Sequence, residues 1–155
     1  MGSGGERAPW TAAEFREGAE LLLEFVSRHP QAGPRVGSLG IAARVLITDL
    51  GLELSLRPSD SRRRKTGHHL AWAWGRPKRA TPTAVEVRLS SVVAARCAQG
   101  KQAVPLALAR KEILVDGSAT KADKEAVLDA VPVLLPLQKP FVALLRGKGL
   151  GNLLI

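Results

Sequence analysis

The sequence is poor in the residue types from which catalytic and metal sites are usually built. Its 155 residues include one cysteine, three histidines and no tyrosine. The single cysteine, Cys97, excludes an internal disulfide and offers no CxxC or zinc pattern. The chain also has no GxSxG nucleophile elbow. Since no pair of catalytic groups can be assembled from these residues, we expect a protein that is not an enzyme and uses no cofactor or metal ion.

The remaining chemical candidates have plainer interpretations. Cys97 lies on a short amphipathic stretch, where a small buried thiol packs as an apolar side chain, and a reactive thiol would need a partner base. His68 and His69 are adjacent, and neighbouring strand residues point to opposite faces, so they make a poor metal site. The glycines of GKGLGN at 147–152 follow no strand and open no helix. We therefore predict a tail there rather than a phosphate loop.

The chain also lacks a secretory signal and a clean membrane-spanning stretch. Residues 1–9 have no apolar core region, and no window reaches the roughly 18 clean apolar residues that a spanning helix needs. The single cysteine fits a reducing compartment. We therefore expect a soluble, cytoplasmic protein.

The most apolar stretch, AVPVLLPLQKPFVALL at 130–145, contains a proline at every fourth position: Pro132, Pro136 and Pro140. Each proline inside a helix removes a hydrogen bond and costs about 3 kcal/mol in an uninterrupted one. The spacing therefore predicts a kinked or segmented helix, which could wall a cavity or act as a movable lid.

Positive charge is concentrated in one part of the chain. The net charge is +9, and residues 57–79 hold eight basic residues against Asp60 alone. Such a surface suits nucleic acid, an anionic membrane or simple solvation. Trp72 and Trp74 lie within this region, at the period-two spacing of a strand. Two interpretations are open: the tryptophans stack on the bases of a nucleic acid, or they face the core. The residues predicted to contact an anionic surface are Arg62, Arg63, Arg64, Lys65, Arg76, Lys78 and Arg79.

Hydrophobic periodicity predicts the order helix, four strands, helix, strand, helix. Thr11 and Glu14 form a capping-box pattern before a helix that ends at His29-Pro30, and Trp10 is placed to pack on Phe15. Residues 41–47 and 52–56 alternate and are joined by TDLG, which indicates a β-hairpin. Further strands are predicted at 70–74, 84–89 and 111–117, with a Ser-capped helix between the last two and a final helix opened by Thr120 and Asp123.

This order predicts an α+β fold with a five-stranded, mostly antiparallel sheet covered by helices on one side. The length and a hydrophobic content of 45% fit a single domain. We expect that domain at 10–146, between a flexible tail at 1–9 and a C-terminal tail at 147–155.

From about Ile41 to Leu145 the chain resembles the sterol carrier protein type-two domain family. The resemblance rests on VEVRLSSVVAARCAQGKQAVPLALARKEILVDG, and on the element order. The positions that match are Ser90, Ser91, Gly100, Pro105, Ala107, Leu108, Lys111, Ile113, Val115 and Gly117. Arg110, the basic loop at 58–69 and the C-terminal prolines depart from the family pattern, and the chain ends LLI rather than in a peroxisomal tripeptide.

The resemblance implies a non-catalytic module that binds or transfers a lipid such as a sterol, fatty acid or acyl-CoA in an apolar tunnel. The C-terminal stretch would then form the tunnel's wall and lid. The residues expected to line the tunnel, each of which is equally well placed in an ordinary core, are Trp72, Trp74, Val93, Cys97, Leu106, Leu134, Leu137, Phe141 and Leu145. The alternative is a nucleic-acid or protein-interaction module that uses the basic turns at 57–79, with nucleic acid the less favoured partner.

Overall fold

Alternating apolar residues build the five strands of one sheet. The computed structural model describes residues 8–40, 42–75, 85–116 and 121–154. The strands lie in the order β3-β2-β1-β4-β5, in which β1 and β4 are parallel and the other neighbours antiparallel. Their bounds are β1 (Ala43–Ile47), β2 (Leu52–Pro58), β3 (Leu70–Trp74), β4 (Val85–Leu89) and β5 (Leu114–Val115). The predicted α+β class and the mostly antiparallel sheet are confirmed.

Along the chain, helices precede, connect and follow these strands. They are α1 (Ala12–Arg28), α2 (Ala32–Ser38), α3 (Ser61–Lys65), α4 (Ser91–Ala98), α5 (Val104–Ala109), α6 (Lys121–Leu134) and α7 (Gln138–Gly147), with short 3₁₀ turns η2 (Leu135–Leu137) and η3 (Gly151–Leu153). The sequence predicts loops over the stretches that form α2 and α3. Both helices are too short for an apolar period to repeat several times, and α3 depends on a local cap, because the N–H of Arg63 donates to Asp60 Oδ1 at 2.9 Å.

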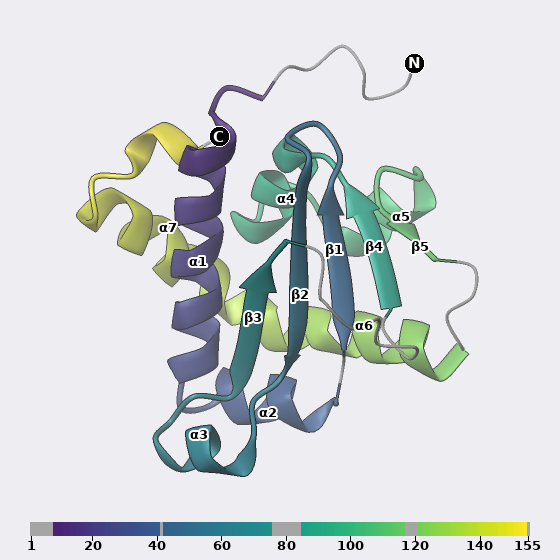
Figure 1. The fold of residues 1–155 in the computed structure, drawn as a ribbon. Helices are drawn as coiled ribbons and strands as arrows, with labels where there is room; N and C mark the ends of the chain where they lie inside the picture. The colour runs from purple at the N-terminus through teal and green to yellow at the C-terminus, as the bar shows by residue number, and fades with distance from the viewer. Residues whose placement is uncertain (1–7, 41, 76–84, 117–120, 155) are drawn as a thin grey trace.

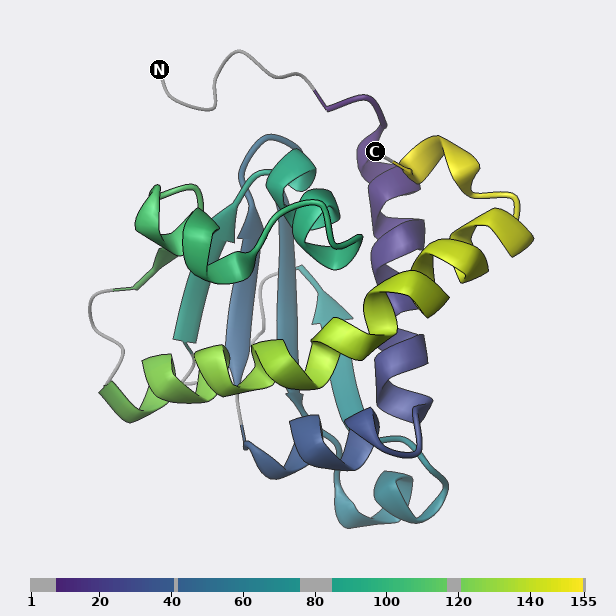
Figure 2. The same ribbon diagram turned by 180° about the vertical axis from the view of Figure 1, so that it is seen from behind.

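Figures 1 and 2 show the layers. Figure 1 looks onto one face of the sheet, and Figure 2 shows α4, α5 and α6 across the opposite face. The β1–β2 hairpin is in the predicted place, with Val45 opposite Leu54, and its turn uses Gly51 at a φ of +63°. β4 does not form a hairpin with β3 but pairs with β1 in parallel, so that Val45 also lies opposite Val87.

α1 begins as its sequence predicts. Thr11 accepts the Glu14 N–H, and the Glu14 carboxylate accepts the Thr11 N–H, which completes the capping box. The Trp10 and Phe15 rings lie 6.2 Å apart, as the predicted staple requires. This end of α1 therefore fixes the direction in which the chain enters the domain.

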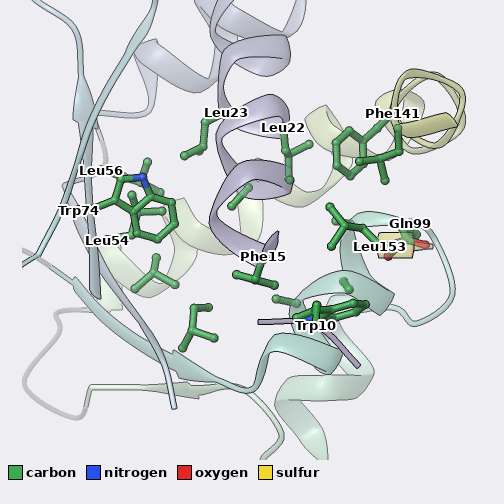
Figure 3. A pocket seen from close by; sticks show the side chains of 18 residues that line it. Trp10, Phe15, Leu22, Leu23, Leu54, Leu56, Trp74, Gln99, Phe141 and Leu153 are labelled. Atoms are coloured by element: carbon green, nitrogen blue, oxygen red, sulfur yellow. The ribbon is translucent and has the colours of Figure 1, made fainter. Parts of the chain in front are cut away.

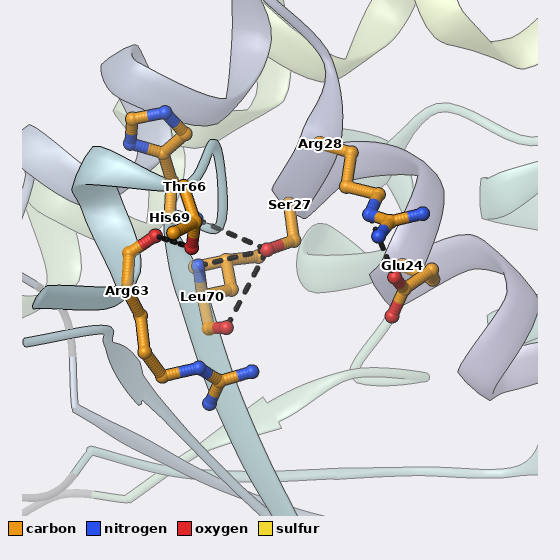
Figure 4. A network of polar contacts seen from close by, with 7 residues as sticks. All are labelled: Glu24, Ser27, Arg28, Arg63, Thr66, His69 and Leu70. Carbon is orange, nitrogen blue, oxygen red and sulfur yellow. Dashed lines mark hydrogen bonds and ion pairs between the residues drawn. The ribbon is translucent and has the colours of Figure 1, made fainter.

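A buried serine joins the other end of α1 to the sheet. Ser27 is fully buried, and its Oγ accepts the N–H groups of His69 and Leu70, each at 3.1 Å. The same hydroxyl contacts the Leu70 carbonyl oxygen at 3.4 Å, so that Ser27 lies at the centre of the network in Figure 4. α1 is thereby held against the beginning of β3.

The proline-rich stretch is segmented, as predicted. Pro132 lies inside α6, Pro136 lies in the 3₁₀ turn η2, and α7 follows from Gln138. The expectation that no stretch could cross a membrane needs correction. Within the described residues, Lys124–Gly147 is long and apolar enough to do so by length and composition alone, a test that the core helix of a soluble protein also passes. Only 11% of its apolar window is buried.

The C-terminal segment folds back onto the domain, which corrects the expected tail over 147–154. Leu153 in η3 is 6% exposed, and its carbonyl oxygen accepts the Gln99 side-chain N–H at 2.7 Å. Gly18 on α1 leaves room for the Leu153 side chain, because a methyl group at position 18 would lie too close to Leu153 Cδ1. The sequence interpretation missed the segment because three residues give no periodicity. Of the expected N-terminal tail, residues 1–7 lie outside the described part.

Candidate functional site: an apolar pocket between sheet and helices

The candidate site is a pocket of about 210 Å³ between the sheet and the helices. Figure 3 shows its walls, which come from β1, β2 and β3 on one side and from α1, α4 and α7 on the other. The lining residues are Trp10, Phe15, Gly18, Ala19, Leu22, Leu23, Val45, Ile47, Leu54, Leu56, Trp74, Ala94, Ala95, Ala98, Gln99, Phe141, Leu145 and Leu153. Gln99 is the one residue among them with a polar, non-aromatic side chain.

The period of each element explains why these side chains meet. Alternate residues of a strand share a face, so that Val45 and Ile47, their neighbours Leu54 and Leu56, and Trp74 all line the pocket. The helices facing them contribute small residues, among them Ala19 on α1 and Ala94, Ala95 and Ala98 on α4. Small side chains opposite branched ones leave volume that the core does not fill.

α4 is held in place by the β1–β2 turn. The Asp49 carboxylate accepts the Ser91 N–H at 2.8 Å and the Ser91 hydroxyl at 2.7 Å. Ser90 caps the same helix as predicted, because its side chain accepts the Val93 N–H. These contacts fix the alanine face of α4 above the hairpin that supplies the opposite wall.

One end of the pocket lies near solvent. Trp74 Nε1 donates to Glu20 Oε1 at 2.8 Å, and the Arg16 guanidinium lies 5.1 Å from the centre of the Trp74 ring. The side chains of Arg16 and Glu20 are about half exposed and form an ion pair with an N···O distance of 3.9 Å. The charged groups therefore stand at the rim, beside Trp74, and none lines the pocket.

The structure places three of the nine predicted lining residues in the pocket wall: Trp74 on β3, and Phe141 and Leu145 on α7. α7 thus forms part of the wall that the sequence interpretation assigned to the whole C-terminal stretch. α6 and η2 contribute no lining residue. The wall role therefore belongs to the second half of the stretch only.

The other six lie elsewhere, and their surroundings give the reason. Trp72 and Leu137 pack around Val26 and Leu70 in a separate core cluster. Val93 and Cys97 face another cluster, built on Ala107 and Ile113, because they occupy the side of α4 turned away from the alanines. Leu106 and Leu134 are 44% and 36% exposed.

α1, which the sequence does not predict to line the pocket, contributes as many lining residues as the three strands together. Phe15, Ala19, Leu22 and Leu23 belong to it, and Trp10 precedes it. Ala19, Leu22, Leu23 and Val26 recur at helical spacing, which predicts a buried face on α1. It could not tell a face that packs solidly from one that leaves space.

The basic residues are only partly described. Arg62, Arg63, Arg64 and Lys65 make up most of α3 and are exposed. The other predicted contacts, Arg76, Lys78 and Arg79, lie outside the described residues. α3 stands at the bottom of Figure 1, away from the pocket lining.

The titratable groups of the described chain offer little chemistry at the pocket. Burial, followed by the charge of Glu112, raises the pKa of the Cys97 thiol, which disfavours the thiolate. Over residues 8–40, 42–75, 85–116 and 121–154, no group of three or more His, Cys, Asp or Glu side chains could hold a metal ion. The arrangement can exclude water and enclose an apolar molecule.

Comparisons with known proteins agree on the fold. No family model matches the chain, and no curated protein matches it in sequence. Over 73% of its length it is similar to the stereoselective inverting sec-alkylsulfatase Pisa1 from Pseudomonas sp., with a TM-score of 0.53 and 15% identity. A double mutant of that sulfatase gives 0.53 and 14% over 74%. The likeness is one of fold.

The match covers only 16% of the sulfatase chain, so this protein spans about one sixth of its length. The ubiquinone synthesis protein UbiJ-SCP2 is similar over 79% of this chain and 90% of its own, with a TM-score of 0.49 and 17% identity. These identities assign no activity. The sterol-carrier resemblance therefore stays a prediction about function.

Proposed function

We propose that the protein binds an apolar small molecule, such as a lipid, in the pocket between α1, α4 and the sheet, and that it does so without catalysis. The observation that carries this proposal is the composition of the pocket wall: apart from Gln99, every lining side chain is aliphatic or aromatic. Burying each CH₂ group of a ligand there gains about 0.8 kcal/mol. An apolar molecule needs no charged partner to bind in such a site.

The volume of the pocket limits which apolar ligands can fit into it. Ligand pockets usually measure about 300–1,000 Å³, and this one measures about 210 Å³. A single short or medium acyl chain, or one aromatic ring system, fits this space better than a sterol. A sterol or an acyl-CoA, which are finer alternatives of the sterol-carrier resemblance, would need a larger pocket than this one.

Filling the pocket tests the proposal. Ala19→Leu places a larger side chain into the lining, whereas Ala13→Leu adds the same groups at an exposed position of the same helix. Titration with the neutral fluorescent probe N-phenyl-1-naphthylamine should show at least a tenfold loss of affinity for Ala19→Leu and no change for Ala13→Leu. Equal affinity of both variants and the wild type would place the probe elsewhere and overturn the proposal.

We also propose that the protein binds an anionic membrane surface and takes up its ligand there. α6 and η2 expose Leu128, Leu134 and Leu135, which are 43%, 36% and 52% exposed. The exposed charged residues close to them in sequence are Lys121, Lys124, Glu125, Asp129 and Lys139. An exposed apolar helix face with lysines nearby suits a helix lying in a bilayer interface. Leu128→Glu with Leu135→Glu should abolish co-sedimentation with phosphatidylserine vesicles at 50 mM salt. Unchanged co-sedimentation would remove this role for α6.

A further inference from the structure

Leu153, in the 3₁₀ turn η3, occupies one end of the apolar pocket. Its side chain belongs to the pocket lining, is 6% exposed and packs in one cluster with Trp10 and Phe141. Figure 3 shows Leu153 between these two rings, beside Gln99. Gly18 faces it from α1, where a methyl group would lie too close to Leu153 Cδ1. The notch that Gly18 leaves in α1 is therefore filled by a side chain of the C-terminal segment.

A glycine-rich link joins η3 to α7. Gly147, Gly149 and Gly151 alternate along it, and Gly149 has a φ of +72°. A methyl group at any of these three glycines would meet no described atom within 4 Å. Because glycine has the widest conformational freedom of all residues, this link can change direction without disturbing α7.

Side chains of other elements hold η3 in place. Gln99 Nε2 donates to the Leu153 carbonyl oxygen at 2.7 Å, and Asn152 Nδ2 donates to Glu14 Oε2 at 2.7 Å. The contact of Asn152 is exposed to solvent, where water competes for both partners. Figures 1 and 2 both show the segment, in yellow, beside the first turns of α1. Leu153 is thus placed in the pocket by its own burial and by hydrogen bonds that a movement of η3 would break.

The space that the pocket offers depends on Leu153. With Leu153 in place the pocket measures about 210 Å³, below the usual range of about 300–1,000 Å³ for ligand pockets. Since Leu153 lines this space, its departure would enlarge the same apolar pocket toward Gly18. The methylene groups of a long ligand would then replace the contacts that Leu153 loses, and each buried CH₂ raises affinity about fourfold. A long chain therefore offsets the cost of displacing Leu153, whereas a short chain does not.

We propose that Leu153 is a displaceable plug. It fills one end of the pocket in the free protein, and an apolar ligand too long for the remaining space takes its place while η3 moves away. This inference rests on the proposed function, since it assigns the ligand length that the same pocket accepts. It distinguishes short chains, which bind beside Leu153, from long chains, which replace it.

Limited proteolysis of the wild-type protein tests the plug. Lys148 is exposed and precedes Gly149, so trypsin cleaves this bond more readily once η3 has moved away. Heptan-2-one and tridecan-2-one are neutral ketones that differ only in chain length. At concentrations that fully displace N-phenyl-1-naphthylamine, tridecan-2-one should accelerate cleavage after Lys148 at least fivefold, and heptan-2-one should leave its rate unchanged. Cleavage within the exposed basic helix α3, which does not line the pocket, is the internal control and should respond to neither ketone.

Substitution of Leu153 tests the same claim through affinity. Leu153→Ala opens room for about three further methylene groups of a ligand chain. We expect tridecan-2-one to bind this variant at least tenfold more tightly than the wild type, and heptan-2-one to change less than threefold. Leu154→Ala removes the same groups from the next residue, which is not part of the lining, and should change neither affinity more than twofold.

The outcomes separate the plug from the proposed function. Binding of tridecan-2-one to the wild type without faster cleavage after Lys148 would overturn the plug and leave the proposed function intact. The same conclusion would follow if heptan-2-one bound and tridecan-2-one did not. If neither ketone displaced N-phenyl-1-naphthylamine, the proposed function itself would fail. Proteolysis of the wild type decides these points even if Leu153→Ala does not fold.

Discussion

The hydroxyl of Ser27, at the end of α1, accepts the backbone N–H of Leu70, the first residue of β3, at 3.1 Å. β3 is an edge strand, and next to the Pro58–Leu70 pair the Ser59 N–H donates to the His69 carbonyl oxygen, so that the N–H of Leu70 points away from β2. Ser27 therefore supplies a hydrogen bond where the sheet begins. In doing so it fixes α1, which forms one wall of the pocket, against the strand that carries Trp74.

Replacing Ser27 should destabilise the protein. Ser27→Ala would leave the buried N–H of Leu70 without its acceptor, whereas the N–H of His69 would keep the Ser27 carbonyl oxygen at 3.2 Å, and we expect a loss of about 1–2 kcal/mol in the free energy of unfolding. Urea denaturation measures it. Ser38→Ala is the control, because Ser38 is exposed and donates to the nearby Arg35 carbonyl oxygen. If both variants lost the same small amount of unfolding free energy, the hydrogen bonds of Ser27 would not be what holds α1 against β3.

Glu86 should make stability depend on pH. Its hydrogen bonds to Arg88, and then to Arg44, lower its pKa below the usual value of 4.5, and the closest N···O distances are 2.6 Å to each arginine. A lowered pKa in the folded state means a contribution that is present at neutral pH and lost as pH falls below about 4.5. Glu86→Gln should therefore cost about 0.5–1 kcal/mol at pH 7 and less at pH 3.

Unfolding curves at both pH values check this expectation. Glu125→Gln provides the comparison, since the Lys121–Glu125 pair is exposed and its closest N···O distance is 4.0 Å. A difference between wild type and Glu86→Gln that stayed constant from pH 7 to pH 3 would contradict the ion-pair account.

Cys97 should react slowly. Because burial and Glu112 raise the pKa of its thiol, little thiolate is present at pH 8. Iodoacetamide should label the folded protein at least tenfold more slowly at pH 8 than the same protein unfolded in guanidinium chloride. Equal rates would show an activated thiol and would reopen the possibility of a nucleophilic role.

The arginines of α3 test the basic surface. Arg62→Ser, Arg63→Ser and Arg64→Ser together should weaken binding to phosphatidylserine vesicles at 50 mM salt, by about 1 kcal/mol for each arginine that contacts the surface, and should leave pocket affinity unchanged. A control removes the same charge elsewhere, at the exposed residues Arg110, Arg146 and Lys148.

Equal effects of the two triple variants would mean that only net charge matters. Salt-sensitive oligonucleotide binding that is lost in the α3 variant alone would favour the nucleic-acid alternative over the membrane.

Local signals predicted much of the fold. The capping box of Thr11 and Glu14, the β1–β2 hairpin and the segmentation at Pro132 and Pro136 each depend on residues close in sequence. The parallel pairing of β1 with β4 could not be predicted in this way, because it joins Val45 to Val87 across two intervening strands. The short helices α2 and α3 were missed because five to seven residues give too little periodicity.

The candidate site was harder to predict than the fold. A lining residue and a core residue have the same composition and the same period, and only tertiary packing separates Trp74, which lines the pocket, from Trp72, which does not. Leu153 illustrates the limit most clearly. It reaches the pocket because Gly18 leaves room for it, a relationship between residues far apart in the chain.

Native mass spectrometry of the purified protein, followed by denaturing extraction, tests the central claim most directly. The account predicts that an apolar molecule of defined mass co-purifies with the protein, or that the stripped protein takes up heptan-2-one at one equivalent. Ala19→Leu should reduce this uptake and Ala13→Leu should not. A clean mass of the protein alone, together with no uptake of heptan-2-one or N-phenyl-1-naphthylamine, would contradict the account and leave the pocket as a packing defect of the fold.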